Sequence, residues 1–213
     1  MRNKRSLAPL SRVLVGAALV ASLGASLSGC IAVVAGAAVG GSLATVDRRT
    51  IGTQTEDEGI ELKAAARLPN VVGDAGHVNV TSYNRKVLLT GEVRDEAMKQ
   101  AVETEVRNTA NVETVINELE IAGASSYTSR ASDALITSKV KLSIADKKTV
   151  PATAVKVVTE RGTTYLMGLV TQREGNIASD VAKGVQGVMR VVKVFEYISE
   201  EDLNSLQTKS ASQ

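Results

Sequence analysis

The chain has 213 residues, with 25 basic and 23 acidic side chains, one cysteine, one histidine and no tryptophan. One histidine and one cysteine are too few for a metal centre of the usual Cys/His type. No segment has the glycine pattern of a phosphate loop or of a dinucleotide-binding turn. The composition therefore predicts no metal, no cofactor and no catalytic residue, so that the chain is not expected to be an enzyme.

Residues 1–29 have the pattern of a secretory signal peptide. Four basic residues precede an apolar stretch that runs from Val13 to Leu27. The sequence Leu27-Ser28-Gly29-Cys30 then resembles the bacterial lipobox. This resemblance implies cleavage before Cys30 and acylation of its thiol with fatty acids such as palmitate. The four basic residues are Arg2, Lys4, Arg5 and Arg12.

Three other interpretations of Cys30 are open: an ordinary signal peptide, a buried structural cysteine, and an uncleaved membrane anchor that continues into the apolar residues 31–46. A span needs about 20 apolar residues. Lipidation is favoured because the only cysteine falls at the position that the lipobox requires, and because it leaves no free thiol in an oxidising compartment. Ile31, where a retention signal would have Asp, favours the outer membrane by resemblance to the Gram-negative sorting rule.

Residues 30–56 are expected to form a tether between the lipid and the folded part of the chain. Without residues 1–29 the chain has 21 basic and 23 acidic residues, a net charge of −2. The excess of basic residues thus disappears with the signal peptide. Together with one Phe and four Tyr, this balance predicts that nucleic acid is not a partner.

The remaining chain contains an internal repeat. Asp57 aligns with Asp133, Gly91 with Gly168, and Val112 with Val188, at an offset of 76 or 77 positions. Each copy predicts a helix with apolar residues at every fourth position, two alternating strands, a second helix and a last strand. In the first copy, the expected elements are a helix with Ile60, Ala64 and Leu68, strands 78–83 and 87–93, a helix at 95–109 and a last strand at 112–121. In the second copy, they are a helix with Ile136, Val140 and Ile144, strands 154–160 and 163–170, a helix at 171–185 and a last strand at 188–198.

This αββαβ order, the glycine at the end of the second strand and the Val-x-x-Val of the last strand resemble the BON domain. The predicted fold class is α+β, with two tandem BON domains, each with two helices on a three-stranded mixed sheet. The expected domains are residues 57–121 and 133–198, with a linker at 122–132 and a disordered tail at 199–213. With the lipobox, the chain resembles the dual-BON-domain outer-membrane lipoproteins of Gram-negative bacteria. The resemblance implies a non-enzymatic periplasmic protein that binds phospholipid and supports integrity of the cell envelope.

The two copies differ in charge. Residues 57–121 have seven basic and twelve acidic side chains, a net charge of −5, whereas residues 133–198 have ten and six, a net charge of +4. A basic surface attracts anionic lipid headgroups. The second copy is therefore predicted to bind an anionic phospholipid of the phosphatidylglycerol type.

The first helix of the second copy contains the candidate lipid-binding residues Leu135, Ser138, Lys139, Lys141 and Leu142. They lie opposite the predicted core face, and leucines beside lysines suit a helix in the headgroup region. The resemblance implies an aromatic residue at the start of this helix as a membrane insert, and Leu135 is expected at that position. Alternatively, Leu135 and Leu142 widen the core or pack against the other domain.

Two polar residues have simpler interpretations than catalysis. His77 is expected to be an exposed imidazole in a loop before a strand, and Asp95 a helix N-cap. A second hypothesis for function is an adaptor, in which the acidic first domain or a free sheet edge binds an envelope protein.

Overall fold

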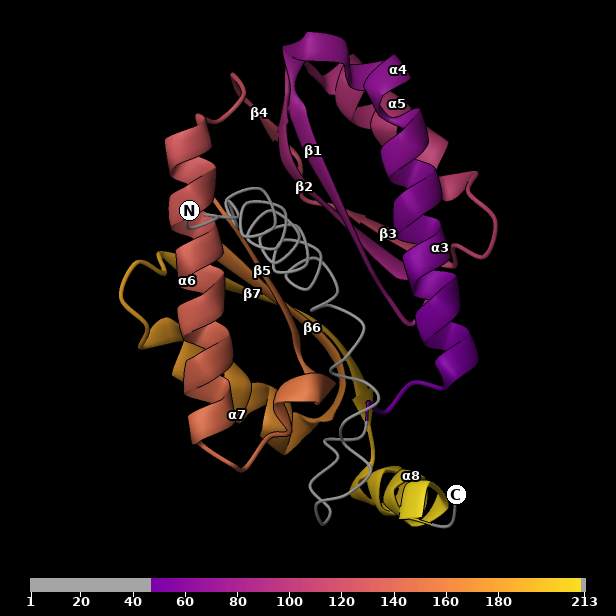
Figure 1. Ribbon diagram of the computed structural model, residues 1–213, viewed down its shortest axis with the longest axis vertical. Helices are drawn as coiled ribbons and strands as arrows, with labels where there is room; N and C mark the ends of the chain where they lie inside the picture. The colour runs from indigo at the N-terminus through magenta and orange to yellow at the C-terminus, as the bar shows by residue number, and fades with distance from the viewer. Residues whose placement is uncertain (1–46, 212–213) are drawn as a thin grey trace, which may run out of the picture. The chain divides into compact units, whose positions relative to one another are not determined.

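The computed structural model describes residues 47–211 (Figure 1), all within one unit, Thr45–Gln213. The predicted signal peptide, Cys30 and most of the predicted tether lie outside the described residues. In the described part of the chain, no helix has both the length and the apolarity needed to cross a membrane.

The first repeat folds into an αββαβ domain in which the last strand is interrupted at Glu118 and Leu119. Strand β2 pairs antiparallel with β1 and parallel with both β3 and β4, so that the sheet is mixed. The elements are α3 (Ile51–Arg67), α4 (Pro69–Val72), a 3-10 turn (Gly73–Ala75), β1 (His77–Tyr83), β2 (Lys86–Val93), α5 (Glu96–Arg107), β3 (Thr114–Asn117) and β4 (Glu120–Ile121).

The second repeat has the same order of elements. Strand β6 pairs antiparallel with β5 and parallel with β7. The elements are α6 (Tyr127–Asp146), a 3-10 turn (Ala152–Ala154), β5 (Lys156–Glu160), β6 (Thr163–Thr171), α7 (Gln172–Lys183), β7 (Arg190–Ile198) and a further helix, α8 (Glu200–Ala211). The predicted fold, two tandem αββαβ domains of α+β class, is therefore confirmed.

Each sheet buries one face under its two helices. In the first domain, Ile60 and Ala64 of α3 and its C-cap Leu68 pack with α5 on β2. In the second, Ile136, Val140 and Ile144 of α6 pack with α7 on β6. These are the residues that the four-residue periodicity predicts for the core, and burial of apolar area is the main free-energy gain in folding.

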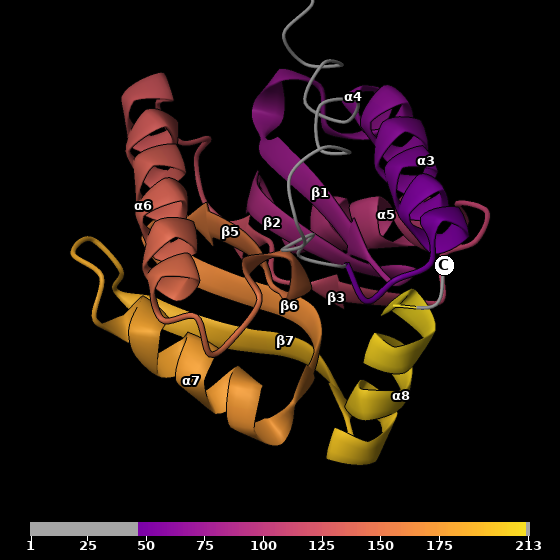
Figure 2. The ribbon, with the colours of Figure 1, turned by 60° about the horizontal axis from the view of Figure 1, so that its bottom comes forward.

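The opposite faces of the two sheets also contribute to a core. Side chains alternate between the faces of a strand, so Leu88 points away from the helices that Val87 and Leu89 contact. Leu88 joins one apolar cluster with residues of the second sheet, in which all members are less than 9% exposed. The two domains therefore share a third core between their sheets (Figure 2), whose buried members are Tyr83, Leu88, Tyr165, Met167 and Val194.

Three segments that the sequence predicts to be irregular are helical. Helix α3 begins at Ile51 with Thr50 as its N-cap, and α6 begins at Tyr127 with Ser126 as its N-cap. The expected tether and linker therefore end six residues early, because capping side chains satisfy the free N–H groups of a helix start. The expected disordered tail is wrong for residues 200–211, which form α8, where Leu203 is only 6% exposed.

Candidate functional site: a lipid-facing helix and a polar seam

Helix α6 has a buried face and an outward face that differ in chemistry. Its 20 residues place Ile136, Val140 and Ile144 against the sheet, with exposures of 8% or less. On the opposite face, Leu135 and Leu142 are 64% and 66% exposed. Leu135 and Leu142 are therefore neither in the core nor packed against the first domain, which rules out the alternative that the sequence left open for them.

The other three candidate residues also lie on this surface. Ser138, Lys139 and Lys141 are exposed, and the Ser138 hydroxyl donates to the carbonyl of Ala134. Within the described residues, Lys139 and Lys141 have no carboxylate partner. By contrast, arginines at the surface of the first domain are paired: Arg67 with Glu105, Arg85 with Glu56 and Glu113, Arg94 with Asp95, and Arg107 with Glu103.

Tyr127 belongs to the same outward face and was missed because it was assigned to the linker. It is the first residue of α6 and is 86% exposed, with the Arg130 guanidinium 4.4 Å from its ring centroid. At about 100° per residue it lies in line with Ser138 and Ala145. An aromatic residue does stand at the start of this helix, eight positions before Leu135. Ser126, a good N-cap residue directly before Tyr127, was the signal that could have revealed it.

A buried carboxylate from the first helix of each domain holds the turn between the first two strands. Asp57 accepts hydrogen bonds from the Ser82 hydroxyl and from the backbone N–H groups of Asn84 and Arg85, at 2.6–2.8 Å. Asp133 likewise accepts from the N–H groups of Arg161 and Gly162. All four turn residues have positive φ, so these carboxylates stabilise a conformation that most residues avoid. The aligned pair Asp57 and Asp133 in the repeat thus has a structural role.

The ionisation of Asp57 and Glu174 makes stability depend on pH. Burial alone would raise the pKa of each carboxyl, but hydrogen bonds, from Ser82 and Arg85 to Asp57 and from Arg48 to Glu174, hold both pKa values below the ordinary 3.8 and 4.5. The unfolded chain then takes up protons before the folded chain does. We expect the free energy of unfolding to be constant near neutral pH and to fall below about pH 4.

Urea unfolding between about pH 7 and pH 3 measures this effect. In Asp57→Asn the loss on acidification should be smaller than in the unchanged protein, because one of the two carboxyls no longer titrates. An equally steep loss in both proteins would contradict the role assigned to Asp57.

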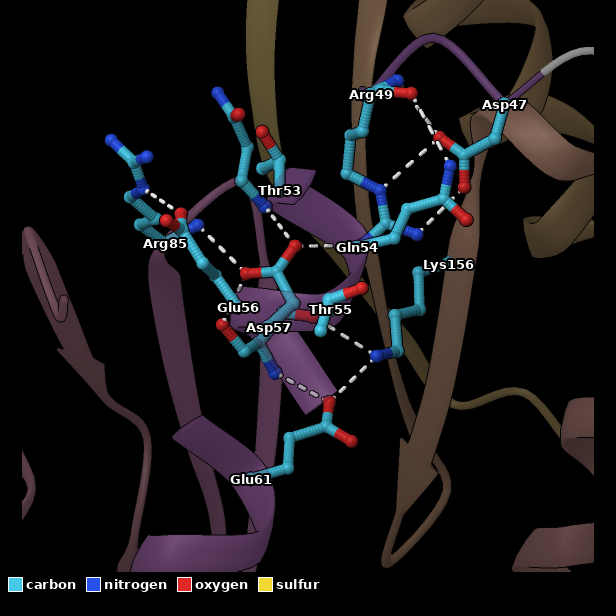
Figure 3. A network of polar contacts seen from close by, with 12 residues as sticks. Asp47, Arg49, Thr53, Gln54, Thr55, Glu56, Asp57, Glu61, Arg85 and Lys156 are labelled. Carbon is cyan, nitrogen blue, oxygen red and sulfur yellow. Dashed lines mark hydrogen bonds and ion pairs between the residues drawn. The ribbon is translucent and has the colours of Figure 1, made fainter. Parts of the chain in front are cut away.

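Residues 47–49, which the sequence assigns to the tether, contact both domains. Arg48 forms a two-bond ion pair with Glu174 at 2.7 and 2.8 Å and donates to the Leu169 carbonyl of the second domain. Arg49 pairs with Asp47 and with Asp57 of the first domain, both at 2.7 Å (Figure 3). The Arg49 guanidinium also lies 4.2 Å from the centroid of the Tyr83 ring. We call residues 47–49 the clasp.

Further polar contacts join the two domains across the interface between them, which we call the seam. Lys156 of β5 binds Glu61 of α3 at 2.6 Å and the carbonyl of Ser82 at 2.9 Å, and Figure 3 shows its ammonium group next to Glu61. Asn79 donates to Glu160 at 2.7 Å, and Asn84 donates to Glu196 at 3.0 Å. The seam thus combines an apolar centre with ion pairs and hydrogen bonds, which favours one arrangement of the two domains.

The expectation for His77 is wrong. It is the first residue of β1 and is half-buried, with Nδ1 3.1 Å from Arg130 Nη1 and Nε2 3.3 Å from the Asn79 amide. Burial and the Arg130 charge lower the pKa of His77. Burial raises the pKa of the nearby Glu160. The residues described include no cluster of three or more potential metal ligands, and His77 has a structural place at the seam.

Residues 56–123 and residues 132–199 each match the family model of the BON domain. These two matches cover more than half of the chain, which therefore belongs to the BON-domain family and contains two BON domains. The particular relatives include outer membrane lipoprotein DolP of Haemophilus influenzae, 37% identical over 91% of this chain and 99% of that protein. The dual-BON, DolP-like architecture that the sequence predicts is confirmed.

Another relative is the 21 kDa hemolysin of Actinobacillus pleuropneumoniae, 31% identical over 72% of this chain and 80% of that protein. Neither protein's name is that of an enzyme. Among solved structures, CdsD of the type III secretion system of Chlamydia trachomatis aligns over 69% of this chain and 98% of that one, at 11% identity. Its TM-score of 0.28 is too low to support any conclusion.

Proposed function

We propose that this chain is an outer-membrane lipoprotein, anchored on the periplasmic side through Cys30, whose second BON domain binds anionic phospholipid. By this contact the protein would support the integrity of the outer membrane. The name of the DolP relative supports the location and the lipid anchor. The lipobox at Leu27–Cys30 supports the anchor independently, from the chain's own residues.

The observation that carries the lipid contact is the outward face of α6. Leu135 and Leu142 are about two-thirds exposed beside Lys139 and Lys141, which have no acidic partner among the described residues. An unpaired lysine near an anionic membrane surface contributes about 1 kcal/mol, and a leucine that leaves water contributes about 2 kcal/mol. Tyr127 extends this face with the amphipathic ring that suits a membrane interface.

The anchor and this contact are compatible in reach. The 16 residues between Cys30 and Asp47 allow a separation of at most about 60 Å when fully extended. This length exceeds the roughly 30 Å length of α6 at about 1.5 Å per residue. The second domain can therefore turn α6 to the membrane while Cys30 stays acylated.

Vesicle binding by the soluble unit, residues 45–213, tests the proposal. Binding to vesicles that contain phosphatidylglycerol should exceed binding to phosphatidylcholine alone and should weaken with salt, because surface charges are screened within about 10 Å at 0.1 M. The double change Leu135→Ser with Lys139→Glu should lower affinity by about 100-fold, from one lost apolar contact and one reversed charge.

The first domain provides a matched control. Leu62 is 74% exposed on α3, next to the exposed Lys63. The change Leu62→Ser with Lys63→Glu has the same chemistry and should leave vesicle binding unchanged. If a folded 45–213 fragment does not bind anionic vesicles, the lipid role of α6 is wrong. The acidic first domain would then become the candidate site, as a surface for a protein partner.

A further inference from the structure

The loop between α7 and β7 contacts α6 at Ile136. Its Gly187 lies against Ile136 of α6, where an added Cβ would come within 2.8 Å of the Ile136 side chain. Met189 follows and lies over Gly162 of the β5–β6 turn, with its Cε 2.5 Å from the position of a Cβ at Gly162. These contacts hold the loop against α6 and the turn, while Met189 remains 78% exposed.

An open groove of about 590 Å³ separates Met189 from the start of α6. The α6 side is lined by serines and other small residues together with Asp133 and Ile136, and the other side by Arg161 and Gly162 of the turn and by Gly187 and Met189 of the loop. Leu135, the residue before Ile136 in α6, and Met189 of the loop are both exposed apolar side chains of the second domain, and the loop contacts α6 at Ile136. Exposed apolar residues close together often mark an interaction surface.

The first domain shows what these positions contain when the residues face water. At the same offset of 76, Leu135 corresponds to Gly59, Ala134 to Glu58, and Met189 to Glu113. Glu113 is 63% exposed and pairs with Arg85 at 3.1 Å. These three positions are therefore acidic or glycine in the first domain and apolar in the second, although the two domains have the same order of helices and strands.

The net charge of the second domain, +4, matches an anionic surface. Arg190, the first residue of β7, is exposed and has no carboxylate partner within the described residues, but its side chain is hydrogen-bonded to Tyr165. Arg161, by contrast, is held by Glu92 at 3.6 Å and Glu120 at 3.2 Å. Lys139 on α6, four residues after Leu135, is exposed and has no carboxylate partner among the described residues, so that it can face an anionic surface.

We propose that Met189 is a second point of membrane insertion, so that the second domain contacts an anionic phospholipid bilayer through α6 and the α7–β7 loop together. This inference rests on the proposed lipid contact of α6 and adds to it. Two contacts fix the orientation of the domain on the bilayer, whereas a single helix would leave it free to rotate about the helix axis.

An environment-sensitive fluorophore tests the insertion directly. Cys30 is the only cysteine of the chain, so the 45–213 fragment has none, and single changes Leu135→Cys, Met189→Cys and Leu62→Cys place one label each. With phosphatidylglycerol vesicles, labels at 135 and 189 should shift to shorter wavelength and label 62 should not. A shift at 135 without a shift at 189 would overturn the inference and leave the proposed function standing. No shift at either position would overturn both.

Substitution of Met189 gives a second readout that needs no label. Met189→Glu, which copies the residue of the first domain, should weaken binding to these vesicles by about 100-fold, since a buried apolar side chain is replaced by a repelled charge. Met189→Leu should bind as the unchanged protein does. Equal binding by the Glu and Leu variants, with α6 unchanged, would show that the loop does not touch the bilayer.

Discussion

Replacement of Arg48 by alanine should lower the free energy of unfolding of the 45–213 unit by about 3 kcal/mol or more. The side chains of Arg48 and Glu174 are only 6% and 3% exposed. Without Arg48, the Glu174 carboxylate would lose two charge-assisted hydrogen bonds and would stay buried beside the N-terminus of α7, where it closes a capping box with Thr171. Urea unfolding followed by circular dichroism measures the loss.

The same helix supplies the control for Arg48. Arg173 pairs with Glu200 at 3.4 Å, but these side chains are 59% and 55% exposed. Because exposed ion pairs contribute less than about 1 kcal/mol, Arg173→Ala should change stability little. Similar losses in the two variants would mean that burial does not determine how much the Arg48–Glu174 ion pair contributes to the free energy of unfolding. The clasp would then not help to hold the domains.

Replacement of Asp57 by alanine should cost about 4 kcal/mol, because three hydrogen-bond donors and one guanidinium lose their common acceptor. The donors are the Ser82 hydroxyl and the N–H groups of Asn84 and Arg85. Among the described residues, Asp133 accepts only from the two N–H groups of its turn. We therefore expect Asp133→Ala to cost about half as much, roughly 2 kcal/mol.

Thermal and urea unfolding of the two variants compare these costs in two domains that have the same order of helices and strands. Asp74, an acid in the 3-10 turn after α4, is exposed and serves as the control, since most surface changes lie within about 0.5 kcal/mol. Equal losses in Asp57→Ala and Asp133→Ala would contradict the extra role of Arg49 and Ser82. An intact Asp57→Ala protein of unchanged stability would refute the role of the carboxylate altogether.

Local sequence determined the elements and their buried faces. The four-residue spacing of Ile60, Ala64 and Leu68 selects one side of a helix, and alternation in Val87–Val93 selects one side of a strand. Caps can be recognised in the same way, because Asp95 and the Thr171–Glu174 box bond to groups within three residues. Periodicity and capping depend on neighbours along the chain, which is why the αββαβ order and both cores were predictable.

The tertiary structure decided which residues of the outward surface and of the seam matter. Arg48 meets Glu174 at a separation of 126 residues, and Lys156 meets Glu61 at 95; no local pattern predicts such pairs. The joint core of Leu88 and Tyr165 also depends on how two sheets face each other. Sequence by itself identified the two BON domains, the lipobox and the lysines and leucines of α6. The positions of Tyr127 and Met189, and the attachment of the clasp to both domains, depend on contacts between distant segments.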